Sequence, residues 1–153
     1  MKDLCLYILM RTDLPSMGQG RATAQASHAS NAFIHKYGCR DLVREWQRQT
    51  KQGFGTAIVL SVNREQMEEL VDSATDVGVP RGRVVDPDYV FTMNREQFDL
   101  VDEQKINYRA FDEIDPMKVL VSKQEVTCAY IFIDRNQVED KIPTLSQLQL
   151  YPA

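Results

Sequence analysis

The residues from Leu4 to Met10 form an unbroken apolar run, with charged residues on both sides of it. A strand with one face in water alternates apolar and polar residues, so a run without alternation is typical of a strand covered on both faces. Such a strand needs a neighbouring strand on each side and a layer of helices above and below. We therefore expect this run to lie in the interior of a sheet, flanked by strands that start at Thr56 and Val126.

The rest of the chain alternates predicted strands with predicted helices. Turn residues, apolar spacing and a pairing of Asn63 with Gln66 that is typical of a helix start set the boundaries. The predicted strands cover 56–62, 83–86 and 126–133, and the predicted helices cover 21–38, 40–51 and 63–78. This order predicts an α/β fold, a three-layer α-β-α sandwich around a mixed, mostly parallel sheet of about four strands.

The chain has 153 residues, 43% of them hydrophobic and 26% charged, which is the size and balance of a single domain. We expect one domain over 1–153, with an insertion-like segment at about 88–122. That segment holds short apolar pieces among 8 acidic and 4 basic residues. It is predicted to form an extra hairpin with one or two helical turns.

Several patterns exclude other classes of protein. No apolar run approaches the roughly 20 residues of a membrane span, and the start of the chain carries no secretory pattern. The three cysteines, Cys5, Cys39 and Cys128, have no CxxC spacing, which indicates a reducing compartment and argues against zinc. The sequence thus predicts a cytoplasmic protein without membrane contact, cofactor or metal.

Three aromatic and imidazole side chains have competing interpretations. His28 and His35 lie seven residues apart on one predicted helix, but no third metal ligand accompanies them, so His28 is expected to pack against the sheet. Trp46 is suited to stack on a nucleic-acid base, yet its place beside Val43 on an amphipathic helix favours the core.

Charge is unevenly distributed along the chain. Residues 1–64 carry 9 Lys and Arg against 4 Asp and Glu, whereas 65–153 carry 9 against 18. Arg40, Arg44 and Arg48 recur every four residues and so share one face of the predicted second helix. A phosphate-bearing partner is therefore expected to dock on the first half of the chain.

A loop with Gly18 and Gly20 joins the first strand to the first helix, and the backbone N–H groups of such a helix start favour an anion. The surrounding string, RTDLPSMGQGRATAQASHA from Arg11 to Ala29, resembles the signature of the type 2 peptidyl-tRNA hydrolases, R-[ST]-D-L-x-M-x-x-G-K-x-A-A-Q-x-x-H-A. The resemblance continues through Trp46, Gly78-Val-Pro80, Asp86, Thr127-Cys128 and Leu148-Gln-Leu150. It covers about four fifths of the chain.

The resemblance implies a mixed four-stranded sheet, a homodimer as a candidate assembly, and a function in translation. The implied reaction is hydrolysis of the carboxylic ester that joins a peptide to the 3′ ribose of tRNA. Arg21 stands where the family has a catalytic lysine, Asp86 matches its acidic residue and Thr127 matches a threonine. A second family threonine falls near Val90. The implied substrate-binding residues are Asp13, Gly18, Gly20, Gln25, Arg40, Arg44 and Arg48.

Ester hydrolysis needs a positioned water, a proton acceptor and donors for the developing oxyanion. Asp86 is the candidate base, Arg21 the candidate cation for a phosphate or oxyanion, and Thr127 the candidate hydroxyl that orients the water. Without the resemblance, Asp86 is equally well interpreted as a turn residue beside Pro87, and Arg21 is interpreted as a surface charge in the first turn of a helix.

Two other functions fit the same sequence. One is a noncatalytic tRNA- or RNA-binding protein that keeps the fold and the basic face, because Arg21 and Val90 replace the family's lysine and threonine. The other is an interaction module that binds a protein through the acidic segment 88–122.

Overall fold

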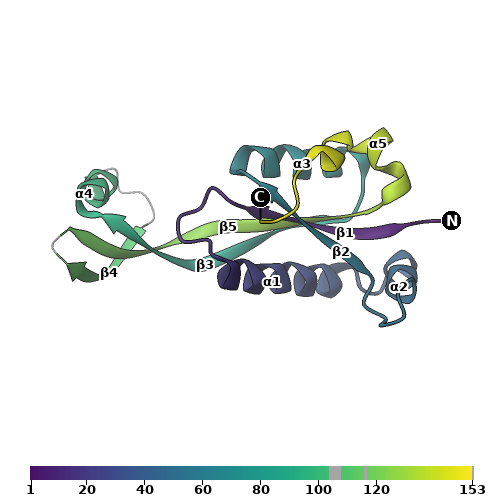
Figure 1. The fold of residues 1–153 in the computed structure, drawn as a ribbon, viewed down its shortest axis with the longest axis horizontal. Coiled ribbons are helices and arrows are strands. Elements are labelled where there is room, and N and C mark those ends of the chain that lie inside the picture. Colours follow the sequence, from purple (N-terminus) through teal and green to yellow (C-terminus); the bar gives the residue numbers. More distant parts are fainter. Residues whose placement is uncertain (104–107, 116, 153) are drawn as a thin grey trace. The chain divides into compact units, whose positions relative to one another are not determined.

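The computed structural model describes residues 1–103, 108–115 and 117–152 (Figure 1). It divides into two compact units, which we treat separately. The first comprises Met1–Asp13, Met17–Val84 and Thr127–Ala153, and the second comprises Leu14–Ser16 and Val85–Val126. The second unit encloses the segment 88–122 that the sequence marks as insertion-like.

The chain contains five strands and five α-helices within the described residues. The strands are β1 (Leu4–Arg11), β2 (Thr56–Val62), β3 (Arg81–Asn94), β4 (Tyr108–Asp115) and β5 (Lys118–Asp134). The helices are α1 (Gln19–Tyr37), α2 (Asp41–Arg48), α3 (Arg64–Val77), α4 (Arg95–Glu103) and α5 (Val138–Lys141). Short 3-10 turns, η1 (Arg135–Gln137) and η2 (Pro143–Gln147), flank α5.

Strand β1 lies in the interior of the sheet, whose order is β2-β1-β5-β3, with β4 paired to β5. All eight residues of β1 are buried. Cys5 pairs with Thr56 of β2 on one side and with Ile133 of β5 on the other. The predicted interior position of the apolar run, between the strands from Thr56 and Val126, is therefore confirmed.

The sheet is mixed, as predicted, but parallel pairing is less extensive than the sequence suggested. Among the described pairings, β1 with β2 is parallel, whereas β1 with β5 and β4 with β5 are antiparallel. A parallel pair needs a long crossover, and the chain between β1 and β2 supplies one in α1 and α2. Strand β5 instead follows β4 through a short connection and runs opposite to β1.

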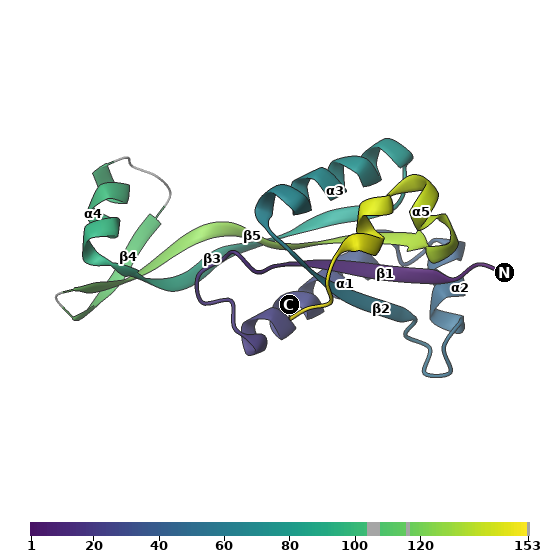
Figure 2. The ribbon, with the colours of Figure 1, turned by 45° about the horizontal axis from the view of Figure 1, so that its top comes forward.

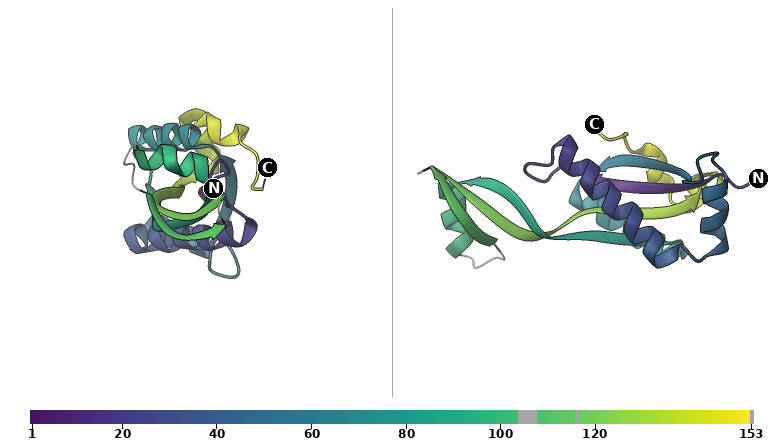
Figure 3. Two further views of the ribbon diagram at one scale, coloured as in Figure 1. Left: turned by 90° about the vertical axis from the view of Figure 1, so that its left-hand side faces the viewer. Right: turned by 90° about the horizontal axis from the view of Figure 1, so that it is seen from below.

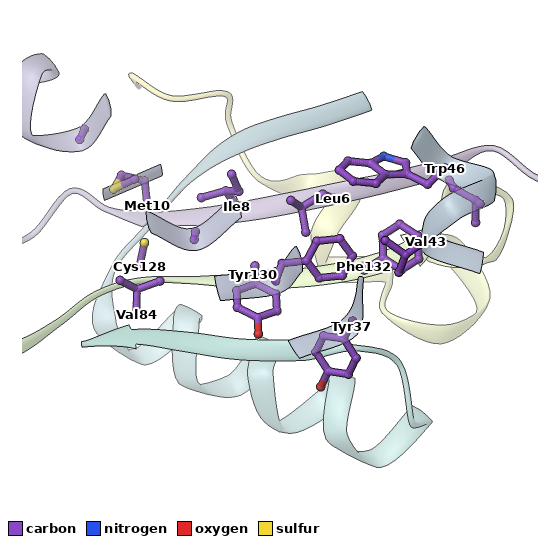
Figure 4. Close-up of a cluster of buried hydrophobic side chains, with 14 residues drawn as sticks. Leu6, Ile8, Met10, Tyr37, Val43, Trp46, Val84, Cys128, Tyr130 and Phe132 are labelled. Atoms are coloured by element: carbon purple, nitrogen blue, oxygen red, sulfur yellow. The ribbon is translucent and has the colours of Figure 1, made fainter. Parts of the chain in front are cut away.

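Helices cover both faces of the sheet in the first unit, which confirms the three-layer α/β sandwich. Helices α1 and α2 lie on one face, and α3 and α5 lie on the other (Figures 1 and 2). The view from below shows α1 running across the sheet (Figure 3). Alternate residues of β1, Leu6, Ile8 and Met10, belong to the core beneath α1 and α2 (Figure 4).

Phe33 of α1 is the centre of this core. Its ring centroid lies 5.0 Å from that of Phe132, 5.6 Å from that of Trp46 and 5.6 Å from that of Tyr130. Trp46 is 3% exposed, and its Nε1 donates to the carbonyl of Thr56 at 2.8 Å. The core interpretation of Trp46 is confirmed, because a buried indole with a satisfied N–H has no face for a base.

The end of the chain covers the outer edge of β2. The amide of Ser61 donates to the carbonyl of Gln149, and the amide of Tyr151 donates to the carbonyl of Val59, each at 2.9 Å. An uncovered edge strand exposes unpaired backbone groups to other chains. The segment around Leu150 thus protects the middle of β2.

Helix α3 begins and ends as predicted. The side chain of Asn63 accepts from the amide of Gln66, and the side chain of Gln66 accepts from the amide of Asn63. Gly78 ends the helix in the left-handed conformation, with φ of 75°. Two strands are longer than predicted: β3 has 14 residues and β5 has 17. Polar residues interrupt both, but the two strands are neighbours in the sheet, so backbone pairing extends them beyond the apolar core.

The second unit contains α4 and the β4–β5 hairpin, in agreement with the expected hairpin and helical turns. Residues 104–107 and 116 of the segment lie outside the described residues. The phenol of Tyr89 is fully buried and donates to the carbonyl of Pro15. Asn94 caps α4 by accepting from the amide of Glu96 at 2.8 Å. Among the described helices of both units, none combines the length and the apolar character that crossing a membrane demands.

Replacement of Gly55 by alanine should destabilise the protein more than the same change at Gly53. Both glycines have a positive φ, 79° at Gly55 and 81° at Gly53, but only at Gly55 would a Cβ meet another group, the ring of Trp46. We expect Gly53→Ala to lose about 1 kcal/mol from backbone strain and Gly55→Ala to lose roughly 2 to 4 kcal/mol in total. Urea unfolding measures both. Equal losses would show that the Trp46 contact contributes nothing.

Candidate active site

The end of β1 is held by an ion pair between a buried arginine and an exposed aspartate. Arg11 is 5% exposed, and its Nε and Nη2 donate to the two carboxylate oxygens of Asp13 at 2.9 and 3.0 Å. One of those oxygens also accepts from the amide of Arg64, the first residue of α3, at 3.2 Å. Burial alone would raise the pKa of Asp13, but the hydrogen bonds from Arg11 and Arg64 outweigh it and lower the pKa.

Asp13 therefore joins β1 to α3 in this structure, a structural role that the sequence did not predict beside the expected substrate binding. The signal was available, because a charged residue at the end of a fully apolar strand needs a partner close by.

Helix α1 begins directly after the glycine loop. Gly18 is its N-cap, with no capping side chain, and the first turn contains no acidic residue. A Cβ added at Gly18 or Gly20 would meet nothing within 4 Å. The first turn of a helix leaves N–H groups without intrahelical partners, and its dipole favours a negative charge. Open space and these donors suit a phosphate or an oxyanion.

Arg21, Gln25 and Thr127 follow one another along α1 and β5. Arg21 is half-buried and lies one turn before Gln25 on the same face of α1. Gln25 is 5% exposed, and its Oε1 accepts a 2.7 Å hydrogen bond from the hydroxyl of Thr127. Cys128 also donates to the Gln25 carbonyl, at 3.5 Å. The structure thus brings together two of the predicted site residues, Gln25 and Thr127.

Thr127 is completely buried, which changes how it can act. A hydroxyl has one proton to donate, and that of Thr127 goes to Gln25 rather than to solvent. Its link to the candidate site therefore runs through the side-chain amide of Gln25. Thr127 is a candidate positioning residue, where the sequence suggested a direct contact with water.

Asp86 lies on β3 in the second unit, whereas Arg21 and Thr127 belong to the first. It is half-buried, and its Oδ1 accepts from the amide of Asp88 at 3.0 Å, across Pro87. This local hydrogen bond, from an amide two residues further on, is the one expected of an aspartate beside a proline turn. Val90, near the position of a family threonine, is also on β3 and half-buried.

The three arginines of the predicted basic stripe are all exposed. Helix α2 covers 41–48 instead of the predicted 40–51, so Arg40 is its N-cap while Arg44 and Arg48 are helical. The Arg40 guanidinium lies 4.7 Å from the centroid of the Tyr37 ring, a cation–π contact that limits its movement.

The expectation that His28 packs against the sheet is wrong, because His28 is exposed. The buried face of α1 instead consists of Ala22, Gln25, Ala29, Phe33 and Tyr37. Within the described part of the chain, no three His, Cys, Asp or Glu side chains lie close enough together to hold a metal ion.

Burial raises the pKa of both Cys5 and Cys128 to about 12. A thiol in that state is protonated at neutral pH and is a poor nucleophile. Neither of these two buried thiols is therefore a candidate nucleophile.

These features define an α/β protein with a cationic, donor-rich site where the central strand passes into the first helix. The family model described as "Peptidyl-tRNA hydrolase PTH2" matches residues 4–93. The match covers more than half of the chain, which therefore belongs to this family. It includes the glycine loop, Arg21 and Asp86, whereas Thr127 and the closing Leu148–Leu150 lie beyond it. A comparison with curated proteins found no match.

Replacement of Thr127 by valine should test the buried hydrogen bond. Valine keeps the shape but leaves the Gln25 oxygen without its donor, which costs about 1 to 3 kcal/mol when the acceptor is buried. Serine keeps the hydroxyl, so Thr127→Ser is the matched control and should lose less. Urea unfolding gives both values. A valine variant as stable as the wild type would show that the bond contributes nothing to the folded state.

Proposed function

We propose that this protein hydrolyses the ester bond of peptidyl-tRNA, or of an N-blocked aminoacyl-tRNA, and releases the peptide and free tRNA. Membership of the peptidyl-tRNA hydrolase family supports a hydrolase of this general type. One observation supports the proposal for this chain in particular. The open glycine loop, the half-buried Arg21 and the hydrogen-bonded pair of Gln25 and Thr127 all belong to the N-terminal end of α1 or contact it.

In the proposed reaction, a water attacks the ester carbonyl while Asp86 takes its proton. The carbonyl oxygen gains negative charge, which the Arg21 guanidinium and the first N–H groups of α1 stabilise. The bond to the 3′ oxygen of the ribose then breaks, that oxygen takes the proton that Asp86 accepted from the water, and a peptide acid and a free 3′ hydroxyl remain. The hydrogen bond between Thr127 and Gln25 anchors this end of α1 to β5, and so helps to hold Arg21 in position one turn away.

In this reaction Arg21 supplies a positive charge that stabilises the anion, and it neither takes nor gives a proton. A guanidinium stays protonated near neutral pH, whereas its planar donors suit both phosphate and oxyanion. This role needs only a cation, which the family's lysine also provides.

The proposal places the protein in the cytoplasm, in translation, with tRNA as its partner and no cofactor. It treats 1–153 as one domain that carries the insertion-like segment, and it names a homodimer as the assembly to test. The noncatalytic RNA-binding alternative is an outcome of the experiment below.

Turnover of N-acetyl-aminoacyl-tRNA should depend on Asp86 and on the charge at Arg21. We expect Asp86→Asn to lose on the order of 10² to 10⁴ in rate, the usual contribution of a positioned base. Arg21→Lys should keep much of the activity, because a cation remains, whereas Arg21→Ala should lose it with little change in stability. Release of the labelled acyl-amino acid under single-turnover conditions gives the rates, and circular dichroism checks the fold.

Two outcomes would contradict this assignment. A wild-type protein that binds tRNA tightly without turnover would support the noncatalytic alternative. A gain of activity in Arg21→Lys would show that arginine at this position had disabled the site.

Binding of tRNA should weaken when Arg40, Arg44 and Arg48 are replaced together by glutamine. Each phosphate that a cation neutralises releases counterions, so the loss of three such contacts should reduce the log–log salt slope by about 2 to 3. Binding measured at several salt concentrations gives the slope. Arg135→Gln, at another exposed arginine, is the control and should change it by less than one. An unchanged slope in the triple variant would mean that these arginines do not contact tRNA.

A further inference from the structure

A cavity of about 310 Å³ lies in the first unit, where β1 begins and β5 ends. Residues from five parts of that unit line it: the starts of β1 and α2, the turn after α3, the end of β5, and the region of α5. It is a different place from the candidate active site. Strand β1 rises roughly 3.3 Å per residue, so its eight residues separate the cavity from Arg11 by roughly 23 Å.

The walls of the cavity are aliphatic. Leu42, Val43, Val77, Val79 and Pro80 contribute to them, together with Leu4, Phe132 and Ile133. The volume is at the lower end of the range of small-molecule sites, which is about 300 to 1,000 Å³. An aliphatic wall with little aromatic surface suits an alkyl group better than a nucleobase, which needs a stacking platform.

Three cations line the same cavity: Lys2, Arg40 and Lys141. The Lys2 ammonium lies 4.0 Å from the carboxylate of Glu45, which compensates part of its charge. Within residues 1–103, 108–115 and 117–152, neither Arg40 nor Lys141 pairs with a carboxylate.

One acid, Asp134, also lines the cavity. Its Oδ1 accepts from the amides of Asp3 and Asn136, at 3.0 and 3.1 Å, so the carboxylate is held by backbone donors. With Lys2 balanced by Glu45, Arg40 and Lys141 exceed Asp134 by one positive charge. A single negative charge matches that excess, whereas a phosphate dianion would be repelled more strongly by Asp134.

We propose that this cavity binds an aliphatic carboxylate, with its alkyl chain between Leu42 and Val79 and its head group between Arg40 and Lys141. Carboxylates accept paired hydrogen bonds from a guanidinium, and the Tyr37 ring already restrains that of Arg40. The binding needs neither tRNA nor turnover, so it stands independently of the proposed function.

Titration of the free protein with straight-chain carboxylates, followed by NMR of its backbone amides, tests the proposal. Octanoate should shift the amides of Leu42 and Val79. Each further buried CH₂ should tighten binding by about fourfold along the series butanoate, hexanoate and octanoate. Octanol has the same chain without the charge and should bind at least about tenfold more weakly.

Charge variants separate this cavity from general surface binding. Arg40→Gln and Lys141→Gln should each weaken octanoate binding by about five- to tenfold. Arg44→Gln changes an exposed arginine of the same helix that does not line the cavity, so it is the matched control and should leave the affinity unchanged. N-acetyl-leucine, used beside octanoate, distinguishes a peptide-like carboxylate from a fatty acid.

Three results would overturn the proposal. The first is equal affinity for octanol and octanoate. The second is an Arg44→Gln variant that weakens octanoate binding as much as Arg40→Gln does. The third is a set of amide chemical-shift changes at millimolar octanoate that does not include Leu42 and Val79. Circular dichroism and thermal unfolding of each variant establish that a lost affinity comes from the lost charge rather than from a lost fold.

Discussion

The burial of β1 on both faces is the constraint on which the rest of the first unit depends. Every residue of the strand is buried, and burying a side chain the size of leucine contributes about 1.5 to 3 kcal/mol. Because side chains alternate along a strand, a shift of one residue in register would move all of them to the wrong layer. The pairing with β2 and β5 is therefore fixed, and so is the position of whatever follows Met10.

Arg11 follows Met10, and the core places its guanidinium where few charges are tolerated. A buried charge is stable only when it is paired and hydrogen-bonded, and the two-point contact with Asp13 supplies both. Asp13 in turn accepts from the first amide of α3. The strand thus fixes the ion pair, and the ion pair fixes where the loop toward α1 leaves the sheet.

The sequence predicted those parts of the fold that local physics determines. The apolar run predicted β1, and the pairing of Asn63 with Gln66 predicted the start of α3, since both signals lie within a few residues of the structure they specify. The extensions of β3 and β5 were missed, because polar residues interrupt the apolar pattern there, while the two strands remain neighbours in the sheet.

Within the candidate site, the motif alone located Arg21 and Gln25, but it could not show their surroundings. The bond between Gln25 and Thr127 joins residues 102 apart in the sequence. Thr127 is buried on β5 where that strand packs against Gln25 of α1, a contact that only the three-dimensional structure reveals. The prediction for His28 failed for a related reason. Its alanine neighbours suggested that it faces the core, but the buried face of α1 is formed by Ala22, Gln25 and Ala29, and His28 lies outside that face.

Because Thr127 is buried, the groups that stabilise negative charge in the proposed reaction differ from the group that takes the proton. The hydroxyl of Thr127 is fully buried and donates to Gln25, and the guanidinium of Arg21 has donors but no acceptor, so neither side chain is the base in the proposed reaction. The first unit therefore offers a fixed positive charge and backbone donors, which stabilise an anion without accepting a proton. The proposed hydrolysis therefore takes its base from Asp86, the carboxylate among the residues matched to the family's catalytic positions.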